Sequence, residues 1–280
     1  MVFWGMSFIW TSILLNYYQP ITIIFFRLIL SAGFLFCIML LFRITRKIER
    51  KDIPLVLLSA FFNPFLYFLG ENYGLKYSSS TIASVIIATI PLFSPIVAWL
   101  FARERIGFMT FTGIVISFAG IVIMLFHKGY TPETGYVGIL FLFGAVLASL
   151  FYSAILRKLV LKYSAITLIA WQNLAGIFLF LPLFLIFDAE KVPQVPLNAT
   201  IISSFLMLAI LASSLSFVFF AHSIKLIGIN KSNIFSNLIP VLTAFFAFLF
   251  SLESFNIQKI IGIVLVIGGV FLSERTRRKS

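Results

Sequence analysis

Long apolar runs separated by short polar or charged breaks make up almost all of the 280-residue chain. A helix needs about 20 mostly apolar residues to cross about 30 Å of hydrocarbon, and its backbone groups must pair internally there. The pattern therefore predicts an all-α polytopic membrane protein. We expect ten transmembrane helices, near residues 2–18, 21–42, 53–73, 80–101, 109–126, 136–156, 165–187, 199–222, 232–250 and 259–273.

Composition agrees with this pattern. Hydrophobic residues make up 61% of the chain and charged residues 11%, with a mean hydropathy of +1.10, so lipid is the expected solvent. The segment Met1 to Tyr18 has no charged leading region, and we expect a first span there rather than a removable signal peptide. The single cysteine, Cys37, excludes a disulfide framework and a cysteine metal site, and packing is its expected role.

The formal charge is +12, and the distribution of the basic residues between loops indicates the orientation of the chain in the membrane. Of the 21 Lys and Arg, sixteen lie in loops on one side or in the C-terminal tail, whereas the other side has only Lys76, Lys128, Lys191 and Lys259. Short cytoplasmic loops retain positive charge, so both termini are expected in the cytoplasm and the number of spans is even. No basic stripe with interleaved aromatics is present, and we expect no nucleic-acid partner.

The chain matches itself without a gap at an offset of 149 residues. In this frame Pro91, Glu104, Gly113 and Gly120 fall on Pro240, Glu253, Gly262 and Gly269. We expect a first repeat at 1–126, an outside linker at 127–135, a second repeat at 136–273 and a cytoplasmic basic tail at 274–280. Five spans per repeat give the two halves opposite orientations in the membrane, which is an inverted-topology plan.

These features carry a resemblance to a known family. They are the opening Trp4-Gly5, Pro20 with Arg27 seven residues later, and the twice-used order of Pro, Glu, Gly and Gly over nearly the whole chain. The sequence resembles the ten-helix drug/metabolite transporter superfamily, in particular members with two EamA-type repeats. It departs from the pattern in the second half, where Gln172 replaces the arginine and no Trp-Gly pair opens the first helix.

The resemblance implies a central cavity among the first four helices of each half, with the fifth and tenth helices packed outside it. Family members move amino acids, other small metabolites, sugars, nucleotide derivatives or drugs, so a small-molecule substrate is implied while its identity stays open. The resemblance also implies location in a bacterial inner membrane, as a monomer or a homodimer in the lipid bilayer.

Two ionisable residues fall inside predicted spans. Arg27 lies roughly 10 Å down a helix that enters from the outside, and Glu71 lies near the outer end of the next, antiparallel span. Their similar depth predicts a contact, because pairing lowers the cost of both charges. A fixed ion pair that orients the helices, or two side chains that extend to the interface, is the alternative.

The second half has a polar pair that corresponds to Arg27 and Glu71 but is neutral or titratable, and we expect it toward the inner side of the membrane. Gln172 aligns near Arg27, and His222 falls on Tyr73, two residues past Glu71. Polar pairs near each mouth would suit an outer and an inner gate, and proton coupling through Glu71 or His222 is a hypothesis. A structural histidine at the interface is the alternative.

Further polar and aromatic residues are candidates for substrate contacts. Asn63-Pro64 predicts a kink at the cavity, with helix packing as the alternative. Trp4 and Trp171 could stack on a substrate, although aromatics in such a chain commonly face lipid. The other candidates for hydrogen bonds to substrate are Ser94, Asn173, Ser213, Ser214, Ser216, Asn233, Asn237 and Thr243.

A separate set is expected to be structural. Pro91 and Pro240 occupy equivalent mid-span places, while Glu104 and Glu253 lie at helix ends as anchors. Each pair of glycines, Gly113 with Gly120 and Gly262 with Gly269, is seven residues apart, which places both on one helix face and permits close packing, including a dimer contact.

These features together predict a secondary active transporter of small metabolites that works by alternating access, with export of amino acids or related metabolites as the leading expectation. Drug efflux and solute uptake are alternatives. An intramembrane enzyme is disfavoured because the sequence has no His-Glu-x-x-His, no paired carboxylates within a span and no phosphate-binding loop. No cofactor or metal is expected. A structural or signalling protein would not need an inverted duplication.

Overall fold

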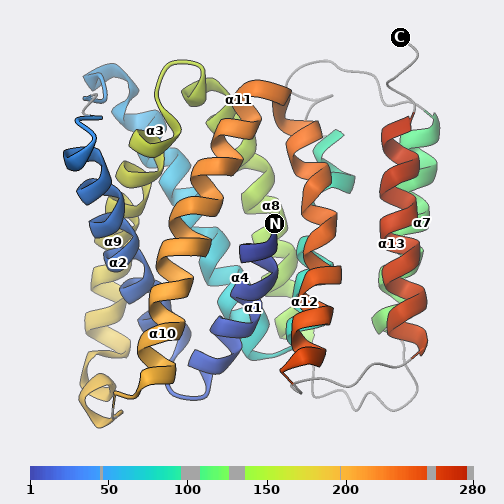
Figure 1. Ribbon diagram of the computed structural model, residues 1–280, viewed down its shortest axis with the longest axis horizontal. Coiled ribbons are helices and arrows are strands. Elements are labelled where there is room, and N and C mark those ends of the chain that lie inside the picture. Colours follow the sequence, from blue (N-terminus) through green and yellow to red (C-terminus); the bar gives the residue numbers. More distant parts are fainter. Residues whose placement is uncertain (45–46, 96–107, 126–135, 196, 251–256, 276–280) are drawn as a thin grey trace.

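The structure, a computed structural model, describes residues 1–44, 47–95, 108–125, 136–195, 197–250 and 257–275. The described residues form an upright bundle of helices (Figure 1). Their helical elements group into ten apolar segments along the chain. The predicted all-α membrane architecture is confirmed. Within the described part of the chain, five segments are long and apolar enough to cross a membrane by themselves: Pro20–Leu41, Arg50–Lys76, Tyr136–Val160, Ala165–Phe187 and Ala199–Ile229.

The first five segments begin with α1 and end with α7. Pro20 opens its helix at the first turn, where its missing N–H costs nothing, and the Ser79 hydroxyl caps another helix by accepting the Ile82 N–H. The elements are α1 (Val2–Leu15), α2 (Pro20–Leu41), η1 (Arg50–Asp52), α3 (Ile53–Ala60), η2 (Phe61–Leu66), α4 (Tyr67–Lys76), α5 (Ser80–Ile87) and α7 (Phe108–Leu125).

The second five segments run from α8 to α13. The elements are α8 (Tyr136–Val160), α9 (Ala165–Phe187), η3 (Ala189–Gln194), α10 (Ala199–Met207), η4 (Leu208–Ser216), α11 (Phe217–Ile234), η5 (Phe235–Asn237), α12 (Leu238–Leu249) and α13 (Ile257–Arg275). Gly228 divides α11, because its φ of +84° lies outside the helical region. The eighth span continues to about this glycine and so ends later than the predicted residue 222.

The third span of each half contains a wide, π-helical turn. In the first half this is η2, where Asn63 leaves helical geometry directly before Pro64. Proline lacks an N–H and cannot continue the regular ladder. The predicted kink is confirmed. In the second half the wide turn is η4, and the 149-residue frame places 61–66 on 210–215, inside η4. This second π-helix was not predicted from the sequence.

Helices α7 and α13, the fifth and tenth segments, pack against each other at the edge of the bundle (Figure 1). A Cβ on Gly120 would lie 2.7 Å from the Gly262 carbonyl oxygen, and one on Gly269 would lie 2.6 Å from that of Gly113. The predicted close-packing glycine faces are confirmed. Since 113 pairs with 269 and 120 with 262, the two helices are antiparallel.

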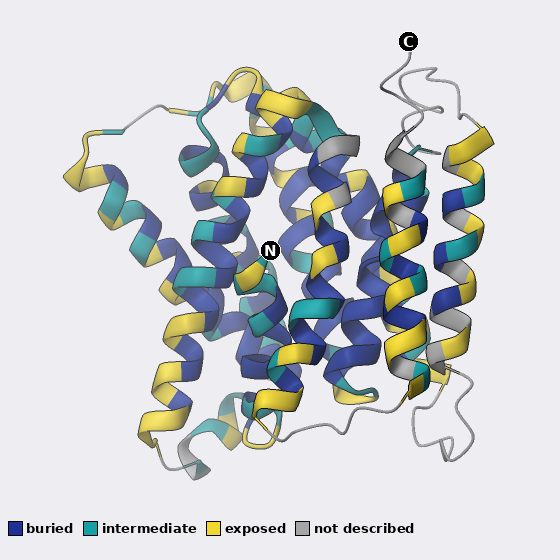
Figure 2. Ribbon diagram, turned by 45° about the vertical axis from the view of Figure 1, so that its right-hand side comes forward, coloured by how far each residue is buried: buried dark blue, intermediate teal, exposed yellow. Residues whose placement is uncertain are grey.

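The core lies between the halves, and the outside of the bundle is apolar. One continuous cluster joins buried residues of both halves, among them Leu28 and Phe68 with Leu142 and Phe180. Large hydrophobic side chains such as Phe108, Ile186 and Phe219 are exposed, as expected for surfaces that face lipid. Exposed positions recur along the outer helices of the bundle (Figure 2). Pro91 and Pro240 are buried within their helices. The predicted anchors Glu104 and Glu253 lie outside the described residues.

Candidate functional site

A small pocket lies at the centre of the bundle, with a volume of about 30 Å³, enough for roughly one or two water molecules. Both halves line it, through α1, η2, α4 and α5 on one side and α8, α11, η5 and α12 on the other. This agrees with a cavity among the first four helices of each half. The lining residues are Trp4, Phe8, Asn63, Tyr67, Glu71, Ile87, Ile90, Ser149, Tyr152, Phe217, Phe220, Asn233, Ser236 and Ile239.

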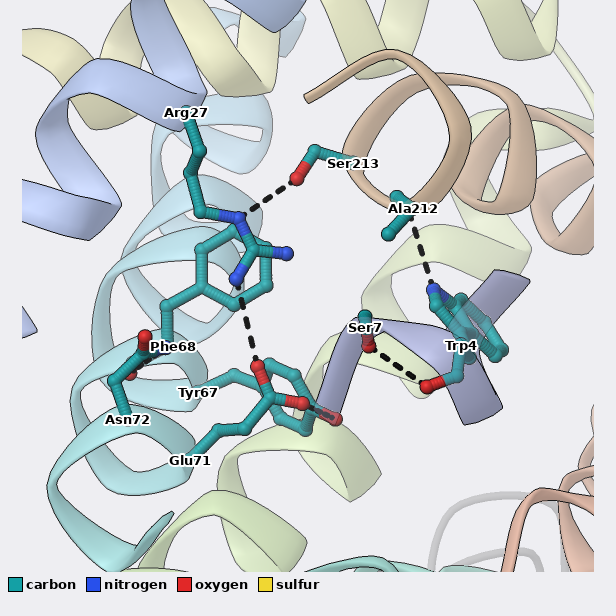
Figure 3. Close-up of polar contacts among 9 residues, drawn as sticks. All are labelled: Trp4, Ser7, Arg27, Tyr67, Phe68, Glu71, Asn72, Ala212 and Ser213. Atoms are coloured by element: carbon teal, nitrogen blue, oxygen red, sulfur yellow. Dashed lines mark hydrogen bonds and ion pairs between the residues drawn. The ribbon is translucent and has the colours of Figure 1, made fainter. Parts of the chain in front are cut away.

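A buried ion pair lies beside the pocket. Arg27 Nη1 of α2 is 3.7 Å from Glu71 Oε2 of α4, and the two residues are only 2% and 7% exposed (Figure 3). The contact predicted from their matching depth is confirmed. Glu71 reaches the pocket itself, whereas Arg27 stands behind it. An isolated charge inside hydrocarbon is costly, and the opposite charge offsets part of that cost.

Both halves of the chain hold the Arg27 guanidinium. Its Nε donates to the Ser213 hydroxyl, at 2.8 Å, in η4 of the second half. Its Cζ lies 3.9 Å from the centre of the Phe68 ring, which is a cation–π geometry. Its Nη1 has no hydrogen-bond partner among the described residues, since 3.7 Å exceeds hydrogen-bond length. The arginine therefore keeps a spare donor.

The Glu71 carboxylate is oriented from its own helix. Tyr67, one turn earlier on α4, donates its hydroxyl to Glu71 Oε1 at 2.9 Å (Figure 3). Tyr67 also lines the pocket. One oxygen of the carboxylate is thus fixed by a phenol, and the other faces Arg27.

Trp4 connects the pocket to the wide turn of the second half. Its indole Nε1 donates to the Ala212 carbonyl in η4 at 3.2 Å, and its ring packs edge-on against Phe217 and Phe220. A π-helix leaves carbonyl groups without their usual partner, which explains why one is available to a side chain. Trp4 and the two Phe rings form an aromatic wall of the pocket.

Gln172 and Asn173 of α9 lie behind the pocket. Gln172 Oε1 accepts from the Tyr152 hydroxyl at 3.1 Å, and its Nε2 donates to Ser59 Oγ at 2.9 Å. Asn173 donates to Ser31 Oγ at 2.7 Å, which is also 2.6 Å from Ser214 Oγ. Gln172 therefore acts on the pocket through Tyr152, a lining residue.

Other predicted site residues are not brought to the pocket. His222 is exposed on α11, because it follows the buried Ala221 by one residue and so shares the outer face with Phe219. The structure does not join it to Gln172. Trp171 is 39% exposed and packs edge-on against Phe36. The remaining candidates Ser94, Ser216, Asn237 and Thr243 are buried elsewhere in the bundle.

Most of the apolar and aromatic residues that line the pocket were not predicted from the sequence. One signal was available: Tyr67 precedes Glu71 by four residues, so a helix places both on one face. Nothing comparable distinguishes the pocket phenylalanines among the 35 in the chain. The lining residues not predicted are Phe8, Tyr67, Ile87, Ile90, Ser149, Tyr152, Phe217, Phe220, Ser236 and Ile239.

The site chemistry is that of binding. Among the described residues no three His, Cys, Asp or Glu side chains gather as metal ligands would. Within the described pocket lining, Glu71 is the charged residue, accompanied by amides, hydroxyls and rings. These side chains offer hydrogen bonds, one charge and aromatic contact, which are the contacts that small-molecule sites use.

Comparisons with known proteins agree with this geometry. The chain matches the model of the EamA-like transporter family over residues 1–126 and 136–275. An uncharacterized transporter of Archaeoglobus fulgidus is 26% identical, over 98% of this chain and 96% of its own length. The uncharacterized inner membrane transporter YicL of Salmonella typhimurium is 25% identical, over 82% of this chain and 76% of its own length.

A solved crystal structure shares the fold, with a TM-score of 0.74 and 16% identity over 97% of this chain and 96% of that one. The family match covers nearly every residue and both halves of the bundle. The chain therefore belongs to the EamA-like transporter family and is an integral membrane transporter rather than an enzyme.

Proposed function

We propose that the protein is a secondary active transporter of small metabolites that works by alternating access, with the central pocket as its substrate site. The observation that carries the proposal is a pocket lined by both halves, with the buried Arg27–Glu71 pair at its side. A pocket of about 30 Å³ is too small for a metabolite. The halves must therefore move apart on one face or the other to admit a substrate.

The orientation of the halves supports this mechanism. The antiparallel packing of α7 and α13 places repeat-equivalent residues against each other, as when Ser117 Oγ donates to the carbonyl of Val266, 149 residues later. Opposite orientation of two five-helix halves accounts for this contact. We further propose that both termini are cytoplasmic, which the lysine and arginine distribution supports.

Amino acids or related metabolites are the proposed substrates, and export is the proposed direction. The Arg27–Glu71 pair is neutral overall, so a zwitterion adds no net charge to the buried site, whereas a lone ion would. The lining combines Glu71, Asn63 and Asn233 with aromatic rings, which suits an ammonium group next to an apolar side chain. Drug efflux and solute uptake are the alternatives.

Proton coupling is proposed to run through Glu71. This carboxylate borders the pocket and can exchange Arg27 for a proton or a substrate ammonium. His222, the other candidate, faces outward from α11.

Flux in proteoliposomes tests the function. Purified protein is reconstituted and loaded with a broad panel of labelled amino acids and related metabolites, and efflux is followed with and without an imposed pH gradient. We expect protein-dependent efflux of at least one solute, a response to the gradient that Glu71→Gln abolishes, and an unchanged response in His222→Ala, the matched titratable control. An absence of flux across the panel would count against transport of these metabolites.

A further inference from the structure

A cluster of charged side chains joins the two halves at one end of the bundle. Lys162, in the connection between α8 and α9, pairs with Asp52 and, at 2.8 Å, with Glu49 in the connection between α2 and α3. Tyr163 donates its hydroxyl to Asp52 Oδ2 at 2.5 Å and accepts the Glu49 N–H at 3.2 Å. We call Glu49, Asp52, Lys162 and Tyr163 the α2–α3 latch.

A second contact joins the halves at the opposite end. Asp188, directly after α9, accepts with Oδ2 from the Thr22 N–H at 3.2 Å and the Thr22 hydroxyl at 3.0 Å. Gln19, the residue before α2, makes no capping bond with its side chain, so the carboxylate of the other half caps this helix. Asp188 is only 4% exposed. We call Thr22 and Asp188 the α9–α10 latch.

The two latches correspond through the repeat. In each, a carboxylate from the connection between the second and third spans of one half binds residues in the first turn of the second span of the other half, or directly before that span. The connections lie at opposite ends of the bundle (Figure 1). The carboxylates are not equivalent residues, since Asp188 directly follows α9 whereas Asp52 directly precedes α3. The arrangement is nevertheless repeated at both faces.

We infer that the α2–α3 latch and the α9–α10 latch are the two closures of the transport cycle: each holds one face shut, and a face opens only when its own latch breaks. The inference rests on the alternating access proposed above. Both latches are formed in this structure, and the central pocket is small. We accordingly assign this structure to the state in which both latches are closed.

The chemistry of the latches suits reversible closure. A hydrogen bond from Lys162 holds the pKa of Glu49 below its usual value. Hydrogen bonds to Asp52 and Glu49 raise the pKa of Lys162. These groups thus stay charged at neutral pH. Because Lys162 and Glu49 are open to water, the solvent can replace their partners when the face opens.

Sided labelling of the pocket tests the inference. In a Cys37→Ser background, Ser236→Cys places a thiol in the pocket lining, and a maleimide that cannot cross the membrane is added to one side of the vesicles. We expect Asp188→Asn and Thr22→Val to speed labelling several-fold from the α9–α10 face only. Asp52→Asn and Tyr163→Phe are expected to do so from the α2–α3 face only. Thr22→Ser, which keeps the hydroxyl, is the matched control.

Labelling needs no transported substrate, so it separates this inference from the proposed function. Faster labelling from the matching face supports the latches even if no solute is transported. Unchanged labelling in correctly folded variants, or equal acceleration from both faces, overturns them even if transport is observed. If Asp188→Asn does not fold, the Thr22→Val and Thr22→Ser pair decides. A Thr22→Cys and Asp188→Cys crosslink is then expected to block labelling from the α9–α10 face alone.

Discussion

At the residue scale, the central feature is the contact between Arg27 and Glu71. Position along the chain was sufficient to predict it, because depth in a membrane follows from the count of residues along a helix. The other partners of the pair were not predicted. Ser213 lies 186 residues from Arg27 and reaches it only because the second half packs against the first. The depth of a residue in the membrane does not determine the direction in which its side chain points. That direction depends on how the helix is rotated about its axis, which is determined by packing against neighbouring helices.

Removing one charge of this pair should destabilise the protein more than removing both. Arg27→Gln or Glu71→Gln leaves the other charge buried and unpaired, at a cost of about 3–5 kcal/mol in the free energy of unfolding. The double variant should lose less stability than either single variant, because it leaves no unpaired charge. Reversible unfolding in detergent, followed by tryptophan fluorescence, measures all three. Strict additivity would show that the two side chains do not interact.

At the element scale, the glycine faces could be predicted from the sequence, whereas a π-helical turn could not. The glycine faces of α7 and α13 were predicted, because a seven-residue spacing places both glycines on one side of a helix. The π-helix η4 was not predicted, because Leu208–Ser216 contains no proline or glycine that would signal a change in the helical hydrogen-bond pattern. Its freed carbonyl is nevertheless what binds Trp4 at the pocket.

Adjacent glycines of α13 provide a matched test of helix packing. A Cβ at Gly269 would lie 2.5 Å from Ser117 Oγ and 2.6 Å from the Gly113 carbonyl, whereas one at Gly268 would meet nothing within 4 Å. Gly269→Ala should therefore destabilise the protein by about 1–3 kcal/mol through overpacking. Gly268→Ala should be neutral or stabilising by up to about 1 kcal/mol. Thermal unfolding in detergent compares them, and equal effects would refute the close approach.

At the scale of the whole molecule, the orientation of the halves determines how the site can work. Charge along the sequence predicts which loops face the cytoplasm, and the repeat predicts that the halves run in opposite directions. The structure adds where the halves meet: at α7 and α13, around the pocket, and at the two latches.

Sided labelling of single cysteines tests the orientation directly. In a Cys37→Ser background, Lys158→Cys at the end of α8 should react with an impermeant maleimide only from the cytoplasmic side. Leu197→Cys, before α10, should react only from the outside. Both positions are exposed, so access to solvent does not limit the reaction. Labelling of both from the same side would refute the proposed topology.

The sequence by itself determined the helices, their approximate ends, the duplication and the Arg27–Glu71 contact, since each follows from periodicity and distance along the chain. Only the tertiary structure decided which side chains form the pocket. His222 and Ala221 are neighbours in sequence, yet one is exposed and the other buried, because one residue turns a helix by about 100°. In a chain whose outer surface and interior are both apolar, hydrophobicity cannot tell these faces apart, and packing between the halves makes the distinction.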